Sequence, residues 1–168
     1  MPAITTDAPS AGMPCSASCD ERGDALQLIE LSRPECLDLL EAQHFGRLIV
    51  GLKGTPVIRP LNYVFDRVSQ SVVFRTGPGS KLHALTRAGT ATFEIDRFDP
   101  ALGEGWSVII RGVITEVTAP GEIERARRLG LNRWPGGPMP HWVRIRAWTV
   151  SGRRVVSPRR SIPSAYLG

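Results

Sequence analysis

The chain has 168 residues, a hydrophobic content of 42%, a charged content of 22% and a formal net charge of +5. A chain of this length and composition can bury a core of its own, which predicts a single globular domain. It has no apolar run near the ~20 residues that span a bilayer, and its first residues lack the pattern of a secretory signal, so neither a membrane partner nor export is expected.

The two ends of the chain are predicted to lie outside this domain. Residues 1–24 are rich in Pro, Ser and other small residues, which predicts a disordered tail. Residues 25–156 are predicted to form the domain, and residues 157–168 a basic C-terminal tail. The three cysteines, Cys15, Cys19 and Cys36, form no disulfide framework and lack a full metal-ligand set, which favours a reducing cytoplasmic location without a metal site.

The ordered part begins with a helix over residues 31–43, where Ser32 and Glu35 have the spacing of a capping box around an early Pro34. The pattern then changes to the two-residue period of strands. The Gly54-Thr55 pair predicts a hairpin turn, and Gly112 predicts a bend or bulge. The other predicted elements are strands 46–53, 56–65 and 71–76, a helix over 80–89, strands 90–96 and 106–117, a helix over 120–131 and a strand over 142–150.

Six strands and three short helices predict a mainly β protein. Helices do not alternate regularly with the strands, so a parallel sheet is not expected. A closed or nearly closed antiparallel barrel with peripheral helices is the most economical arrangement, because closure removes exposed sheet edges.

The segment FRTGPGSKL, residues 74–82, predicts a strand, a tight loop and a helix start. Ser80 occupies the N-cap position and Lys81 the first position of the helix. A helix N-terminus attracts phosphate, and the Thr76 hydroxyl and Arg75 guanidinium could assist. The order Ser-Lys-Leu excludes a nucleotide P-loop, which needs a hydroxyl residue directly after the lysine. The alternative is an ordinary strand–turn–helix junction that binds no ligand.

The segment IRPLNYVF, residues 58–65, is a predicted strand with two unusual residues. Pro60 cannot donate a ladder hydrogen bond, and Asn62 is rare in a strand interior. The strand is therefore expected at a sheet edge. Its backbone either faces solvent there or lies against a flat ligand ring whose rim is hydrogen-bonded by Asn62.

Five segments in order, GRLIV, PVIRPLNYVF, VVFRTGPGSKL, ATFEID and GWSVIIRGVITEV, resemble the flavin-binding split β-barrel family. This is the pyridoxamine 5'-phosphate oxidase-like superfamily, and the resemblance is closest to its bacterial branch with nitroimidazole-resistance-like members. It covers roughly residues 28–155 and implies a six-stranded antiparallel split β-barrel with FMN bound at a homodimer interface. It does not include the C-terminal Arg-x-His element of the true oxidases, so their vitamin substrate is not implied.

The resemblance also implies the cofactor-binding residues. The strand along the isoalloxazine ring and ribityl chain matches Arg59, Pro60, Leu61 and Asn62. The strand end near the phosphate matches Arg75 and Thr76, and the phosphate-binding pair matches Ser80 and Lys81. A strand start near the ring matches Trp106 and Ser107. No catalytic residue is assigned, because the flavin itself performs the redox chemistry.

These observations favour an FMN-dependent oxidoreductase that takes electrons from a reduced nicotinamide or similar donor and acts on a small organic substrate. A carrier or sensor that binds a flavin, a deazaflavin or haem without turnover is the second hypothesis. A third is a basic module that binds nucleic acid or an acidic partner, since residues 121–168 carry ten Arg against Glu122 and Glu124. Nucleic acid is a minor option, because these arginines follow no known binding motif. Trp142 and Trp148 are predicted at the centre of the dimer interface.

Overall fold

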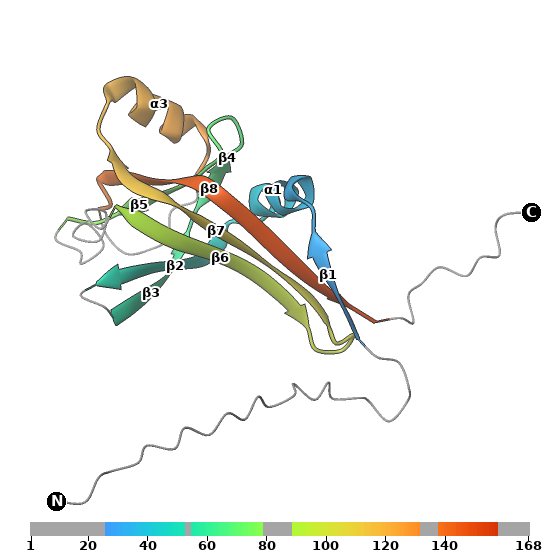
Figure 1. Cartoon of the computed structure of the whole chain (residues 1–168). Coiled ribbons are helices and arrows are strands. Elements are labelled where there is room, and N and C mark those ends of the chain that lie inside the picture. Colours follow the sequence, from blue (N-terminus) through green and yellow to red (C-terminus); the bar gives the residue numbers. More distant parts are fainter. Residues whose placement is uncertain (1–25, 53–54, 79–88, 132–137, 158–168) are drawn as a thin grey trace, which may run out of the picture.

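The computed structural model describes residues 26–52, 55–78, 89–131 and 138–157, and within them one antiparallel sheet of eight strands (Figure 1). The mainly β antiparallel architecture is therefore confirmed, with eight strands where six were predicted. The elements are β1 Gln27–Leu31, α1 Arg33–Ala42, β2 Phe45–Leu52, β3 Thr55–Asn62, β4 Val64–Asp66, β5 Ser71–Thr76, β6 Thr90–Asp99, β7 Glu104–Val117, α3 Pro120–Arg128 and β8 His141–Val156. Of the predicted helix over 80–89, only Gly89 is among the described residues. Gly54 of the predicted hairpin turn lies outside them.

The capping box predicts the start of α1 correctly. The Ser32 hydroxyl accepts a hydrogen bond from the Glu35 N–H, and the Glu35 carboxylate accepts one from the Ser32 N–H at 2.8 Å. Two of the free N–H groups at the helix start are satisfied in this way. The helix ends at Ala42, and its buried residues Cys36, Leu37 and Leu40 pack against the sheet.

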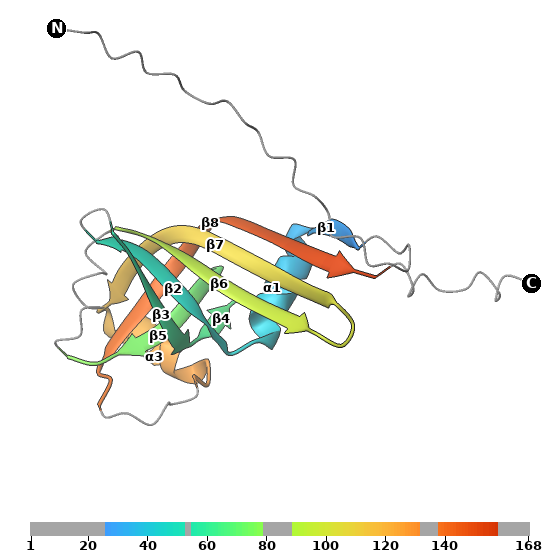
Figure 2. The ribbon, with the colours of Figure 1, turned by 90° about the horizontal axis from the view of Figure 1, so that it is seen from below.

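The strands follow the order β3-β2-β6-β7-β8-β5-β4, with β1 paired to β8. Figures 1 and 2 show β6, β7 and β8 running together from the end that carries β2, β3 and β5 to the end that carries β1. The predicted bulge at Gly112 is confirmed, since the register with β8 shifts between Arg111 and Gly112. A Cβ at Gly112 would lie 2.1 Å from the Arg146 carbonyl oxygen, so this close approach requires glycine.

Tyr63 joins the two outer strands of the sheet. The predicted strand 56–65 breaks at this residue, so that β3 pairs with β2 at one edge while β4 pairs with β5 at the other. The Tyr63 N–H donates to the His44 carbonyl at 3.0 Å, and its hydroxyl donates to the Leu40 carbonyl at 2.8 Å. Its ring packs edge-on against Phe93, with 4.8 Å between centroids. The barrel is thus closed at this corner by the chain itself.

Two hydrophobic clusters lie on opposite faces of the sheet. The larger fills the barrel between the sheet and α1 and includes Leu48, Phe74, Phe93, Ile110 and Ile145. The smaller lies on the outer face under α3 and comprises Val73, Val117, Ala126 and Trp142, with partly buried neighbours. The outer face is therefore covered at the α3 end only, as far as the described residues extend.

Candidate functional site

The free edge of β3 has the properties expected from Pro60. The strand is terminal in the sheet, and Pro60 lies opposite Arg47 within a continuous ladder to β2. Because Pro60 has no N–H, its backbone must point away from β2, and in an antiparallel strand Ile58 and Asn62 then point the same way. The Ile58 carbonyl indeed accepts a hydrogen bond from the Arg59 guanidinium at 3.4 Å rather than from β2. The predicted edge position of this strand is confirmed.

The strands β3 and β5 diverge from the Tyr63 corner. The ladder between β4 and β5 begins at the pair Val64–Val73, and no ladder among the described residues joins β3 to β5. The end of β3 with Leu61 and Asn62 therefore lies on one side of this corner. The end of β5 with Arg75 and Thr76 lies on the other side. Beyond the Tyr63 corner the barrel is therefore split between β3 and β5, which carry two of the predicted site segments.

The predicted site residues along this split differ in exposure. Leu61 and Thr76 are buried, at 9% and 4% relative exposure. Asn62 and Arg75 are half-buried, whereas Arg59 and Pro60 are exposed. Alternation along each strand places Leu61 and Thr76 toward the barrel interior and Asn62 and Arg75 toward the outside. Ser80 and Lys81, the predicted phosphate pair, lie outside the described residues.

Arg75 and Trp142 form a pair on the outer face. The Arg75 guanidinium lies 5.0 Å from the centroid of the Trp142 ring, within the range of a cation–π contact. Trp142 is only 6% exposed and belongs to the cluster under α3, so it is buried within this chain rather than presented at its surface. Trp148, at 54% exposure, is presented at the surface.

An imidazole–carboxylate pair that the sequence pattern did not reveal lies beside Thr76. His141 is directly opposite Thr76 in the β5–β8 ladder. Its Nδ1 is 2.7 Å from a carboxylate oxygen of Glu116 on β7, and both side chains are nearly one-third exposed. The two residues are 25 positions apart in the sequence, and only the strand register brings them together.

Trp106 and Ser107 point to opposite faces of β7. Ser107 pairs with Asp96, whose carboxylate accepts a hydrogen bond from Arg47 on β2. Through these registers, Ser107 shares the outer face with Asn62, three strands away. Trp106 instead faces inward and packs against the main core cluster. One planar ligand on one face of this chain can contact only one of the two side chains.

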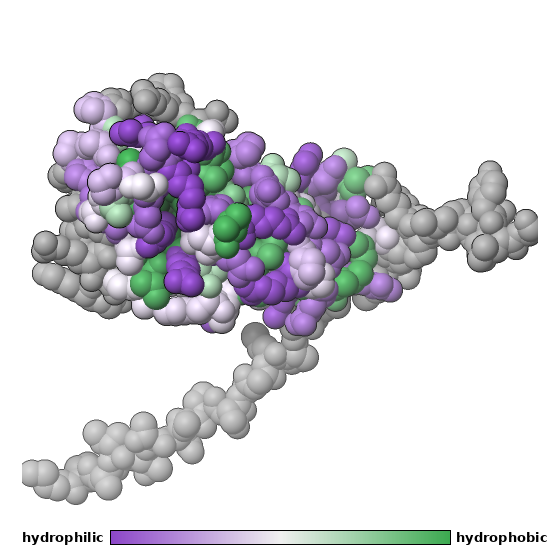
Figure 3. All heavy atoms as spheres, turned by 90° about the horizontal axis from the view of Figure 1, so that it is seen from above, coloured by the Kyte–Doolittle hydropathy of each residue, from purple (hydrophilic) through white to green (hydrophobic). Residues whose placement is uncertain are grey.

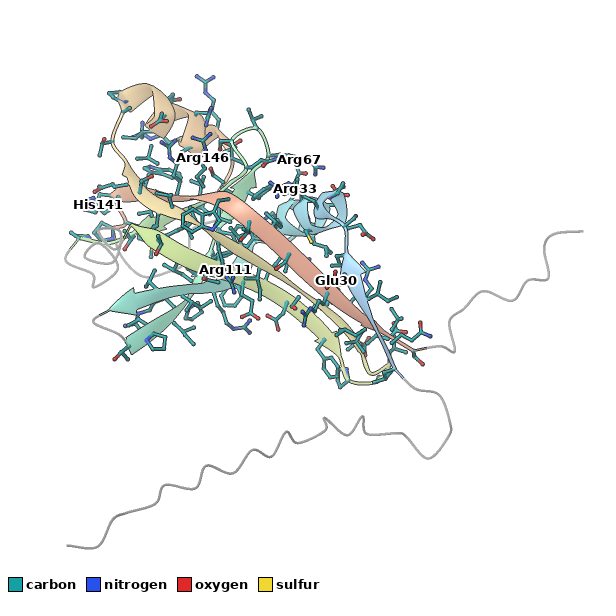
Figure 4. The ribbon with its side chains drawn as sticks, in the orientation of Figure 1. Glu30, Arg33, Arg67, Arg111, His141 and Arg146 are labelled. Atoms are coloured by element: carbon teal, nitrogen blue, oxygen red, sulfur yellow. The ribbon has the colours of Figure 1, made fainter. Side chains whose placement is uncertain are left out.

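The Ser107 end and the Thr76 end of the predicted site are far apart on one chain. On β8, the neighbour of Thr76 is His141 and the neighbour of Ser107 is Arg153. Twelve residues separate these neighbours, which corresponds to about 40 Å along the strand. Figure 4 shows His141 at one end of the sheet and Glu30, which pairs with Arg153, toward the other. An FMN molecule spans less than half of this length.

Several of the arginines that give residues 121–168 their positive net charge form ion pairs within the chain. Arg125 contacts buried Asp66 at 3.1 Å, and Arg144 contacts Glu122 at 2.7 Å. Among the described residues no cluster of metal-ligating side chains occurs, and no helix is long and apolar enough to cross a membrane. On the face seen in Figure 3, hydrophilic residues prevail and hydrophobic ones form small separate groups. These ion pairs weaken the third hypothesis, in which a basic module binds nucleic acid or an acidic partner.

The fold defines the class of protein, an antiparallel split β-barrel in which β3 is a terminal strand of the sheet. The model of the pyridoxamine 5'-phosphate oxidase family matches residues 32–154, and the chain belongs to this family.

Proteins similar to this chain include a curated relative and two solved structures. The uncharacterized protein Rv0080 of Mycobacterium tuberculosis is 32% identical over 142 residues, which cover 82% of this chain and 91% of the relative. The structure of the FAD binding protein from Mycobacterium smegmatis shares 36% identity at a TM-score of 0.65, covering 75% of this chain and 98% of that one. A 5-nitroimidazole antibiotic resistance protein from Bacteroides thetaiotaomicron, at 14% identity and a TM-score of 0.63, covering 79% of this chain and 90% of that one, shares the fold.

Proposed function

We propose that this protein binds a flavin nucleotide in the split between β3 and β5 and acts as an FMN-dependent oxidoreductase. The observation that carries the proposal is the juxtaposition of two features at that split. A strand edge that pairs with no further strand among the described residues lies on one side, and a strand end with a buried hydroxyl and a guanidinium lies on the other. This donor set fits a ligand that has a flat hydrogen-bonding ring at one end and a phosphate at the other.

Each residue has a role that follows from its position. The backbone groups of Ile58 and Asn62 would pair with the polar rim of the isoalloxazine ring, in the way that an added strand pairs with a sheet edge. Arg75, Thr76, Ser80 and Lys81 would hold the phosphate, since charged and hydroxyl donors bind it strongly. The bound flavin supplies hydride or electron transfer between a reduced nicotinamide donor and a small organic acceptor or oxygen.

We propose further that the site is completed by a second copy of the chain. Ser107 lies too far from Thr76 for both to contact one FMN within a single chain. A partner subunit would bring its own Ser107 to the ring whose phosphate is held by the first subunit. The exposed side chain of Trp148 on the outer face is suited to such an interface. The buried Trp142 is not part of that surface.

A complementation experiment tests the shared site. Lys81→Glu replaces the proposed phosphate-binding cation by an anion. Ser107→Tyr places a bulky side chain where the flavin ring is proposed to lie. Each variant alone should bind little FMN, whereas a mixed dimer should regain one intact site, formed by Lys81 of one subunit and Ser107 of the other. No recovery in the mixed dimer, or a mass of one 18.4 kDa chain by light scattering, would contradict the shared site.

Flavin binding itself is tested with a matched pair of lysine variants. Lys81→Ala should weaken FMN binding by about one to two decades, because a charge-assisted bond to phosphate contributes roughly 1.5–3 kcal/mol. Lys53→Ala, the other lysine of the chain, serves as the control, since the sequence places it at a turn away from the site. Equal FMN affinity of the two variants in a fluorescence titration would refute the phosphate role of Lys81.

The choice among cofactors needs a direct comparison. FMN follows from the family resemblance, but the Mycobacterium smegmatis relative is described as binding FAD, which contains the same ring and ribityl phosphate. Titration with FMN, FAD, a deazaflavin and haem separates these candidates by affinity. Tighter binding of FAD than of FMN would change the assigned cofactor but not the location of the ring.

A non-catalytic flavin carrier or sensor is the second candidate. It is favoured by the description of the Mycobacterium smegmatis protein, which names binding and no turnover. Anaerobic mixing of the flavin-loaded protein with NADH or NADPH separates the two. Bleaching of the flavin followed by multiple turnovers with an acceptor supports the enzyme, and a flavin that stays oxidised supports the carrier.

A further inference from the structure

A hollow of about 290 Å³ lies at the free end of the β6–β7 hairpin, on the face opposite Ser107. Its volume is at the lower end of the range for small-molecule sites. The residues that line it are Arg97, Asp99, Leu102, Glu104, Gly105, Trp106, Arg154 and Val155. They come from three adjacent strands and from the turn that joins β6 to β7.

The centre of the hollow is an aromatic ring between two cations. Trp106 on β7 is directly opposite Arg97 on β6 and Arg154 on β8. Side chains at directly opposite positions have Cβ atoms roughly 5 Å apart, so the side chains of Arg97 and Arg154 flank Trp106 on the same face of the sheet. Trp106 also packs against the main core cluster, and it lines the hollow as well.

The two carboxylates that line the hollow, Asp99 and Glu104, accept hydrogen bonds from backbone N–H groups. The Asp99 carboxylate accepts hydrogen bonds from the N–H groups of Ala101 at 3.0 Å and Leu102 at 3.4 Å. The Glu104 carboxylate accepts one from the Ser157 N–H at 3.2 Å.

The two arginines, in contrast, have no carboxylate within salt-bridge distance in the part of the chain that the structure describes. Glu35, at the start of α1, is the other acid near Arg154 and is held by Ser32. Within the described residues neither Arg97 nor Arg154 therefore forms a salt bridge, although the charge of Arg154 helps to lower the pKa of the Glu35 carboxyl.

We propose that this hollow is a second binding site, for a planar aromatic carboxylate. The indole face of Trp106 would stack on the aromatic ring of the ligand, and the Arg97 and Arg154 guanidinium groups would hold its carboxylate by bidentate hydrogen bonds. The site does not depend on the flavin proposal, because Trp106 faces away from the outer surface that carries Asn62 and Ser107.

Calorimetric titration of the full-length protein with 2-naphthoate tests this site. The variants Arg97→Gln and Arg154→Gln should each weaken binding about tenfold or more, and Trp106→Leu should weaken it as well. Arg153→Gln is the matched control, because it removes the same charge at the next residue but on the opposite face of β8. The neutral analogue 2-naphthalenemethanol should bind at least about tenfold more weakly than 2-naphthoate.

Each remaining outcome decides the proposal. Equal losses of 2-naphthoate affinity in Arg153→Gln and Arg154→Gln would show a general attraction of the anion to positive charge and would overturn the proposed site. Full affinity for 2-naphthoate in the Arg97→Gln/Arg154→Gln double variant would also overturn it. Displacement of 2-naphthoate by FMN would assign the hollow to the cofactor site and refute a separate one, whereas unchanged naphthoate affinity in FMN-saturated protein supports it. Conservative Lys variants at both arginines, which keep the charge, should retain part of the affinity if the protein remains folded.

Discussion

Replacement of Tyr63 by Phe tests the closure of the barrel at its corner. The change removes one hydroxyl from a side chain that is 1% exposed. That hydroxyl donates at 2.8 Å to the Leu40 carbonyl, which lies in the last turn of α1. Carbonyls in the last turn have no partner within the helix, so the substitution leaves a buried acceptor without this donor.

The expected loss in free energy of unfolding is about 1–3 kcal/mol, the cost of an unsatisfied buried polar group. At the slope typical of a chain of this size, ~2 kcal/mol corresponds to a fall of about 4–8 °C in the melting midpoint. Burial raises the pKa of Tyr63, so the hydroxyl remains protonated and the loss should be the same at neutral and mildly alkaline pH.

Urea denaturation of the wild type, Tyr63→Phe and Tyr63→Ala measures these differences. Tyr63→Ala also removes the ring that packs on Phe93 and should cost about 3–5 kcal/mol. Val68→Ala, at a residue that is 89% exposed, is the control and should change stability by less than about 0.5 kcal/mol. A Tyr63→Phe protein within about 0.5 kcal/mol of the wild type would refute the role of this hydrogen bond.

Three further predictions concern other features of the fold. Gly112→Ala should destabilise the protein by at least about 1–3 kcal/mol in urea denaturation, because the new Cβ would collide with a β8 carbonyl, and unchanged stability would mean that the bulge relaxes freely. Burial raises the pKa of the Cys36 thiol, so in a variant that keeps only this cysteine a thiol reagent should react on unfolding and not in the native state. Hydrogen bonds from the Ser32 side chain and N–H lower the pKa of Glu35 from its ordinary value of 4.5, so its stabilising contribution is present above that pH and is lost as the pH falls through the lower folded pKa. Urea midpoints between about pH 3 and pH 6 should therefore fall more steeply in the wild type than in Glu35→Gln, and parallel curves would contradict this.

The sequence predicts those parts of the fold that depend on local chemistry. The capping box of Ser32 and Glu35 marks the start of α1, and the predicted strand over 71–76 gives β5 with its observed bounds. Gly112 marks the bulge because only glycine permits the close approach of two strands. In each case a few neighbouring residues determine the structure.

The features that were missed depend on distant partners. The pattern over 56–65 is that of one continuous strand, yet the chain changes its pairing partner at Tyr63, and nothing within the segment signals this change. Similarly, β1 is five residues long and forms against β8, which lies more than 120 positions later in the sequence. The pairing of His141 with Glu116 and the distance between Thr76 and Ser107 follow from strand register, which the sequence pattern leaves undetermined.

The position of β3 at the edge of the described sheet has a consequence for the aggregation of the protein. Unpaired backbone groups at a sheet edge can bind the strand of any other chain, which is a common route to aggregation. Pro60 limits this reaction, because an incoming strand would meet a position without a donor in the middle of its new ladder. Exposed Arg59, one residue before it, adds a charge that disfavours the approach of an apolar strand. The same short segment can thus stay at the edge of the sheet without pairing with the strand of another polypeptide.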